Sequence, residues 1–157
     1  MKRNCCLLVG AVAVFVLVGR LAINHNDDLH FAEKLSRLDR AVSWILRSRL
    51  ASIKHPVVSL PPVHADLTTT HLAYNSLGPD DPPALFFPTL PPSEYCSGPS
   101  GLVYCERKVP MDHYGTQWLT FYCEAYKGPI HLIISPIAAP GSYQGIKKYW
   151  YWAEPFS

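Results

Sequence analysis

The sequence predicts an α+β protein with four parts: an N-terminal single transmembrane helix, an amphipathic helix, a proline-rich extended segment and a small antiparallel β-sheet domain. Three observations support this: an apolar run near the N-terminus, a helical repeat of apolar residues, and aromatic-rich strand-like segments later in the chain. Without the anchor, the chain is long enough for one domain with a modest core. The predicted boundaries are 1–25, 26–54, 55–93 and 94–157.

The first part is a membrane anchor or a secretory signal. Lys2 and Arg3 precede an apolar run from Cys5 to Ile23 that only Arg20 interrupts. Spanning a bilayer takes about 20 apolar residues and a signal core takes about 7–15, so the length permits both. No candidate cleavage site has small residues at both required positions, which favours an uncleaved anchor. Because basic residues favour the inner side, we expect a single-pass protein with its N-terminus in the cytosol or a mitochondrial matrix.

Residues 5–23 are therefore predicted to contact membrane lipid. The rest of the chain would be extracytoplasmic, periplasmic, lumenal or in an intermembrane space; cleavage would instead release a secreted protein. Cys5 and Cys6, at the inner edge of the run, are either palmitoylation sites or small apolar residues of the anchor.

Residues 26–50 show the pattern of an amphipathic helix. Asn26, Asp27 or Asp28 can cap its start. Apolar residues then recur at spacings of four, three, four and three, which places them on one face: Phe31, Leu35, Leu38, Val42 and Ile45. We expect this face to pack on its own domain or on a partner subunit. Self-association and an anionic membrane surface remain alternatives.

Residues 55–93 form the proline-rich segment. Nine of the fifteen prolines lie here. Because proline fixes φ and lacks an amide donor, we expect neither a long helix nor a central strand. Phe86 and Phe87 are too apolar for an unattached linker, so they are predicted to pin an extended segment to the domain or a neighbour.

The C-terminal part is predicted to be a meander of three or four antiparallel strands, with the amphipathic helix covering one face. The expected strands are roughly 94–96, 102–108, 117–125 and 130–135. A further aromatic cluster ends the chain. Alternation in a terminal strand would bury either Tyr149 and Tyr151 or Trp150 and Trp152, and expose the other pair.

Three cysteines of this domain follow tyrosines. In an oxidising compartment we predict one disulfide, Cys96–Cys105, because it would close around the hairpin connection 97–101, with Cys105–Cys123 as the alternative. A zinc site made of Cys96, Cys105, Cys123 and His113 lacks the close-set cysteine pair typical of such sites. We therefore predict no metal.

The charge pattern and motifs narrow the function. Residues 29–54 have a balance of +4 and residues 55–157 a balance of −3. The basic residues lie on one helix beside the anchor, which argues against nucleic-acid binding. Phosphate loops and the HExxH and GxSxG motifs are missing from the sequence, and the Asp112-His113 dipeptide is a weak signal for a general base. No catalytic residue and no cofactor is predicted.

We therefore expect a non-catalytic, membrane-anchored accessory subunit or interaction and assembly factor. The alternative is a secreted or anchored module that holds a ligand or carbohydrate on its C-terminal aromatics; an enzyme using Asp112 and His113 is third. The residues predicted to bind a protein partner are Phe31, Leu35, Leu38, Val42, Ile45, Phe86, Phe87, Trp150 and Trp152.

Overall fold

The computed structural model describes residues 30–52, 54–78, 80–90, 98–124, 127–137 and 149–155. Ser36–Ser157 form one compact unit and Met1–Leu35 belong to another. The predicted anchor, its two cysteines and Cys96 lie outside the described residues. Within the described ranges, no helix is both long and apolar enough to cross a membrane.

The predicted amphipathic helix is confirmed over residues 30–47. Leu38, Val42 and Ile45 are at most 3% exposed, as the helical repeat requires. The helix ends because Arg49 takes a left-handed conformation, with φ at 56°. The Leu50 N–H then donates to the Ile45 carbonyl (3.2 Å) and the Arg49 N–H to the Leu46 carbonyl (3.1 Å), the paired bonds of a Schellman cap.

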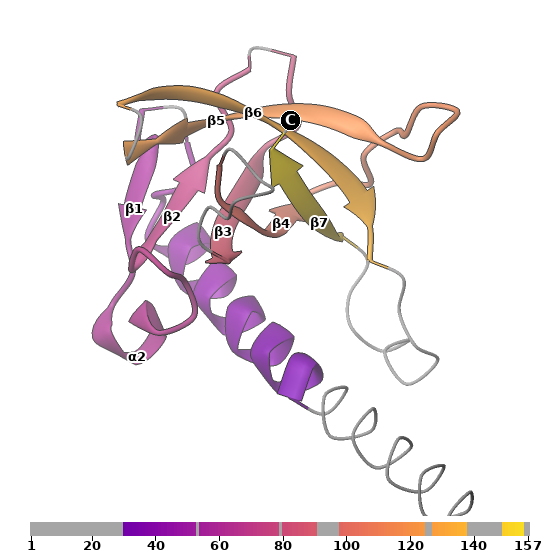
Figure 1. Cartoon of the computed structure of the whole chain (residues 1–157). Coiled ribbons are helices and arrows are strands. Elements are labelled where there is room, and N and C mark those ends of the chain that lie inside the picture. Colours follow the sequence, from indigo (N-terminus) through magenta and orange to yellow (C-terminus); the bar gives the residue numbers. More distant parts are fainter. Residues whose placement is uncertain are drawn as a thin grey trace, which may run out of the picture. The chain divides into compact units, whose positions relative to one another are not determined.

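The remaining elements form one antiparallel sheet of seven strands in the order β1-β2-β3-β4-β7-β6-β5 (Figure 1). The sheet curls so that β5, at one edge of the sheet, approaches β2, the second strand from the other edge. Ser76, directly after β2, bridges Phe121 of β5, and the Leu77 N–H donates to the Thr120 carbonyl (2.8 Å). The strands are β1 Val57–Ser59, β2 Leu72–Asn75, β3 Ala84–Leu90, β4 Ser100–Cys105, β5 Gln117–Cys123, β6 Gly128–Pro136 and β7 Trp150–Pro155, and a short helix, α2 Pro62–Ala65, lies between β1 and β2.

The inside of the curl is an apolar core. Side chains of alternate residues on each strand point inward, as the pleat requires. Phe86 and Phe121 meet at the centre with ring centroids 5.5 Å apart, and both are fully buried. The inward residues of the other strands complete the cluster, among them Tyr74, Val103, Cys105, Leu119, Leu132, Ile134, Tyr151 and Ala153.

The outer face of β3, β4 and β7 is covered as well. Trp150 of β7 contacts Phe87 of β3 (5.8 Å between centroids) and Tyr104 of β4 (5.5 Å). The Trp150 indole N–H donates to the Asp39 carboxylate of the helix at 2.9 Å. Residues 36–47 of the helix therefore lie against this outer face. The helix thus packs on its own domain, one of the two placements expected for its apolar face.

The prediction that the proline-rich segment contains no central strand was wrong. This segment supplies β1, β2 and β3, and β3 lies between β2 and β4. Pro88 is tolerated within β3 because it lies past the residues that pair with β2. Its carbonyl accepts the N–H of Thr69, which precedes β2, at 2.8 Å. The missing amide of Pro88 faces that same side, so no ladder bond is lost. A bulge follows at Pro88–Leu90, opposite Gly101.

The predicted meander differs from the sheet observed. Strands near 117–125 and 130–135 are confirmed as β5 and β6, which pair with each other. However, β4 pairs with β7, and β7 pairs with β6, so the terminal strand is inserted into the expected order. The region 94–96 lies outside the described residues.

The insertion of β7 also argues against the alternative disulfide between Cys105 and Cys123, which assumed neighbouring strands. These residues lie on β4 and β5, which β7 and β6 separate in the sheet, and both thiols are buried and free. The other predicted pair involves Cys96, which the structure does not describe.

Candidate binding groove

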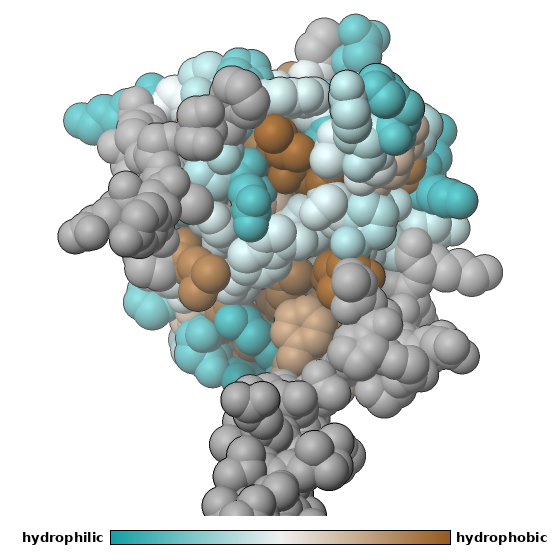
Figure 2. All heavy atoms as spheres, turned by 45° about the vertical axis from the view of Figure 1, so that its right-hand side comes forward, coloured by the Kyte–Doolittle hydropathy of each residue, from teal (hydrophilic) through white to brown (hydrophobic). Residues whose placement is uncertain are grey.

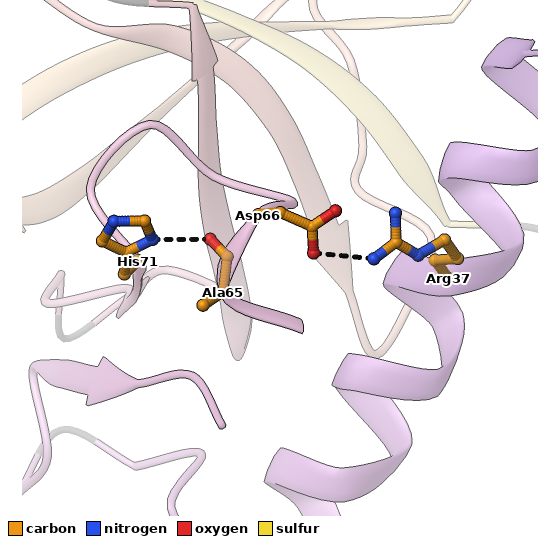
Figure 3. Close-up of polar contacts among 4 residues, drawn as sticks. All are labelled: Arg37, Ala65, Asp66 and His71. Carbon is orange, nitrogen blue, oxygen red and sulfur yellow. Dashed lines mark hydrogen bonds and ion pairs between the residues drawn. The ribbon is translucent and has the colours of Figure 1, made fainter. Parts of the chain in front are cut away.

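The short helix α2 is held beside the long helix by one ion pair. Arg37 Nη2 donates to Asp66 Oδ1 at 2.6 Å, and Asp66 directly follows α2 (Figure 3). On the other side of α2, His71 Nδ1 lies 2.9 Å from the Ala65 carbonyl oxygen. The two prolines Pro61 and Pro62 start α2, since proline suits the first helical position. The segment is thus fixed at both sides.

A groove of about 850 Å³ runs between the two helices. Val63 of α2 is 68% exposed, the largest apolar exposure after Tyr114 among the described residues. Trp44 is half-buried, and Arg40, Ser43 and Arg47 are exposed. Leu46 and His64 complete the lining. We call this site the α2 groove: Arg40, Ser43, Trp44, Leu46, Arg47, Val63 and His64.

The α2 groove carries positive charge that the described structure does not neutralise. Arg40 donates to the Ser36 hydroxyl (3.3 Å) and Arg47 to the Ser43 carbonyl (3.1 Å). Among the described residues neither guanidinium meets a carboxylate. Arg37, in contrast, forms the ion pair with Asp66, and its hydrogen bond holds the pKa of that carboxyl below its usual value. The groove therefore combines two unneutralised arginines with an apolar wall.

Two buried polar atoms beside α2 have no hydrogen-bond partner among the described residues: His64 Nδ1 and Thr68 Oγ1. Unpaired buried groups of this kind cost stability. Their position, in and just after the short helix, makes this the least well satisfied part of the described fold.

A second, smaller cavity of about 140 Å³ lies between the chain after the long helix and strands β2 to β4. Asp81 lines it, and its Oδ2 accepts the Thr120 N–H (2.9 Å) and the Gly78 N–H (3.2 Å). Asp81 is therefore occupied in joining the 77–81 loop to β5. Burial, and secondarily the charge of Asp81, raises the pKa of the Cys105 thiol to about 12, so this thiol is a poor nucleophile at neutral pH.

Most residues predicted to bind a partner are buried within the chain. Trp150 is 8% exposed and is occupied by Asp39, Phe87 and Tyr104. Trp152 is half-buried and donates to Glu154 (2.7 Å). Phe31 is half-buried, and the others are at most 3% exposed: Leu35, Leu38, Val42, Ile45, Phe86 and Phe87.

The expectation that one aromatic pair at the C-terminal strand is buried and the other exposed was wrong. In each pair, Tyr149/Tyr151 and Trp150/Trp152, one residue is buried and the other half-buried. Tyr151 points into the curl, where its hydroxyl accepts the Val109 N–H at 3.1 Å, and Tyr149 packs against the same core. Trp150 is buried on the opposite face. The core covers one face of β7, and the helix contacts the other face at Trp150.

Asp112 and His113 lie in an exposed turn. Asp112 Oδ1 accepts the backbone N–H groups of Tyr114 and Thr116, both at 2.9 Å, and these bonds within the turn lower the pKa of its carboxyl. The carboxylate thus stabilises the turn and does not orient the neighbouring imidazole. Among the described residues, no group of three or more histidine, cysteine, aspartate or glutamate side chains is placed to hold a metal ion.

On the face shown in Figure 2, hydrophobic residues form separate patches among hydrophilic ones. No family model, curated protein or solved structure matches the chain. The α2 groove was not predicted from sequence. The sequence indicated only that Arg40 and Arg47 lie on the polar side of a helix. Nothing in the sequence around Val63 and His64 indicates that these two residues lie opposite that helix.

Proposed function

We propose that this protein is a non-catalytic, single-pass membrane-anchored accessory subunit or assembly factor that binds a protein partner. The observation that carries the proposal is the arrangement of the chain: a basic N-terminus and one apolar run of membrane-spanning length precede a unit with its own core. The anchor would hold the unit Ser36–Ser157 at the membrane, on the side opposite the cytosol or matrix.

The surface of that unit supports a binding role. Its buried apolar residues form a cluster inside the curl, and Leu38, Ile45 and Phe87 are buried on the side of the long helix. The α2 groove remains, with exposed Val63, half-buried Trp44 and two arginines. Tryptophan and arginine are enriched among the residues that dominate protein–protein binding energy.

The test is the intact mass of the protein, together with its copurifying chains, after mild detergent extraction of membranes from its native source. We expect the full-length mass in the membrane fraction, with stoichiometric partner chains. A chain shortened by about twenty residues, alone in the soluble fraction, would instead indicate a secreted module and contradict the proposal.

A further inference from the structure

We propose that the α2 groove binds an acidic, extended segment of the partner protein, with its carboxylates on Arg40 and Arg47 and an apolar side chain on Val63 and Trp44. This inference rests on the proposed function and names the chemistry of the partner. It is carried by the charge, the apolar wall and the orientation of the helix.

The two arginines are placed to act together. They are seven residues apart on one helix, which is two turns and about 10 Å along the axis. Both are exposed, and both line the α2 groove. In the described structure their only hydrogen bonds go to neutral oxygens of Ser36 and Ser43, so each retains donors for an incoming carboxylate.

The apolar wall distinguishes a peptide segment from a small anion. Val63 lies on α2 and exposes 68% of its surface. The Arg37–Asp66 ion pair and the His71 contact with the Ala65 carbonyl hold α2 in place. Such a fixed apolar contact adds nothing to the binding of a bare phosphate or carboxylate. It suits a leucine or aromatic side chain flanked by acidic residues.

The helix orientation favours a peptide over a membrane surface. An amphipathic helix binds a bilayer by burying its apolar face in the interface. Here Leu38, Val42 and Ile45 already face the sheet and are at most 3% exposed. The side of the helix that faces outward is basic and lines the α2 groove, so its apolar face is not available to enter a bilayer.

The experiment uses the full chain, purified in an uncharged detergent, on an array of 12-residue peptides. The peptides contain leucine and glycine with zero to four glutamates, and a second set carries lysine in place of each glutamate. We expect binding to rise with the number of glutamates. The double variant Arg40→Glu/Arg47→Glu should lose about tenfold or more in affinity, because two charge-assisted contacts become repulsive.

The matched control is Arg107→Glu/Lys108→Glu, which makes the same change of charge at exposed positions after β4. It should alter binding by no more than about twofold, since rim charges away from the site act weakly through screened fields. Val63→Ser, which removes the apolar contact and adds no charge, should reduce binding of the glutamate peptides without changing the melting temperature. Equal losses in the control pair, or no preference for glutamate over lysine, would overturn the proposal.

A membrane is tested as the other occupant with phosphatidylserine vesicles and the full chain reconstituted in neutral nanodiscs. Vesicle binding that depends on Arg40 and Arg47, without glutamate-peptide binding, would assign the groove to lipid and overturn the inference. The same variant distinguishes an error in the groove assignment from an error in the proposed function. If partners copurify equally with the Arg40→Glu/Arg47→Glu variant, the anchored-subunit proposal stands and only the groove assignment is wrong.

Discussion

The Trp150 indole N–H donates to the Asp39 carboxylate at 2.9 Å, across 111 residues of sequence. This bond joins the helix to the last strand of the sheet, on the outer face where Phe87 and Tyr104 flank the indole ring. Together with the burial of Leu38 and Ile45, it fixes which side of the helix faces the sheet. With Leu38 and Ile45 turned to the sheet, Arg40 and Arg47 are left on the outside.

Replacing Trp150 should show the strength of this bond. Trp150→Phe removes the donor and leaves a partly buried carboxylate, so the free energy of unfolding should fall by about 2 kcal/mol, measured by urea denaturation. A double-mutant cycle with Asp39→Ala isolates the pair from lost packing. Additive effects of the two substitutions would show that the bond does not form in solution.

The bulge in β3 predicts a severe effect at Gly101. A Cβ at this position would fall on the Phe87 carbonyl oxygen and within 2.9 Å of Pro88 Cα. Because both are backbone atoms, Gly101→Ala must move a strand, and it should destabilise the fold by about 3 kcal/mol. Gly115→Ala is the control: φ is +75° there but no atom lies within 4 Å, so thermal unfolding should show a loss of only about 1 kcal/mol. Similar losses at both glycines would contradict the bulge.

Asn75 connects the end of the helix to β2. Its buried side-chain amide donates to the Leu50 carbonyl (2.9 Å) and to the His55 carbonyl. Asn75→Ala should cost about 2–3 kcal/mol at any pH, because two acceptors lose their donor.

The pH dependence of a second variant at this position tests the geometry. Asn75→Asp places a carboxyl against two carbonyl oxygens, which raises the pKa of the introduced group in the folded state. Its penalty should therefore be smaller at pH 3, where the carboxyl is protonated, than at pH 7. A penalty independent of pH would show that position 75 does not face these carbonyls.

The ion pair beside α2 predicts a titration result. The hydrogen bond from Arg37 lowers the pKa of Asp66 from its ordinary value of 3.8. The pair therefore stabilises the fold above that ordinary value, and this contribution is lost as the pH falls through the lowered pKa. Carbon NMR of the carboxyl should show the Asp66 pKa rising towards its ordinary value in Arg37→Gln. Asp112, whose pKa its own turn lowers, should not change; a matching change there would indicate general unfolding.

Local patterns in the sequence predicted the helix and the strands β5 and β6, because their apolar periodicity and β-branched or aromatic content act over neighbouring residues. The same reasoning failed for β3. Whether Pro88 disrupts β3 depends on which neighbouring segment faces its missing N–H. That segment contains Thr69, 19 residues earlier in the chain, which no local pattern identifies. The insertion of β7 between β4 and β6 likewise depends on pairings between distant segments.

The α2 groove could not be predicted for a related reason. One wall belongs to the long helix, whose exposed arginines resemble any solvated helix face. The other wall depends on Arg37 meeting Asp66, 29 residues away. Only when that ion pair places α2 do Val63 and the two arginines share one site.

The most direct test of the account is site-specific photo-crosslinking from Val63 in native membranes, with Tyr114, which is 78% exposed, as the control position. We predict that a crosslinker at Val63 captures one partner chain at a peptide with net negative charge, and that Arg40→Glu/Arg47→Glu abolishes the product. The crosslinker at Tyr114 should not capture that peptide. A Val63 product that is lipid, or a peptide without acidic residues whose yield is independent of both arginines, would contradict the account.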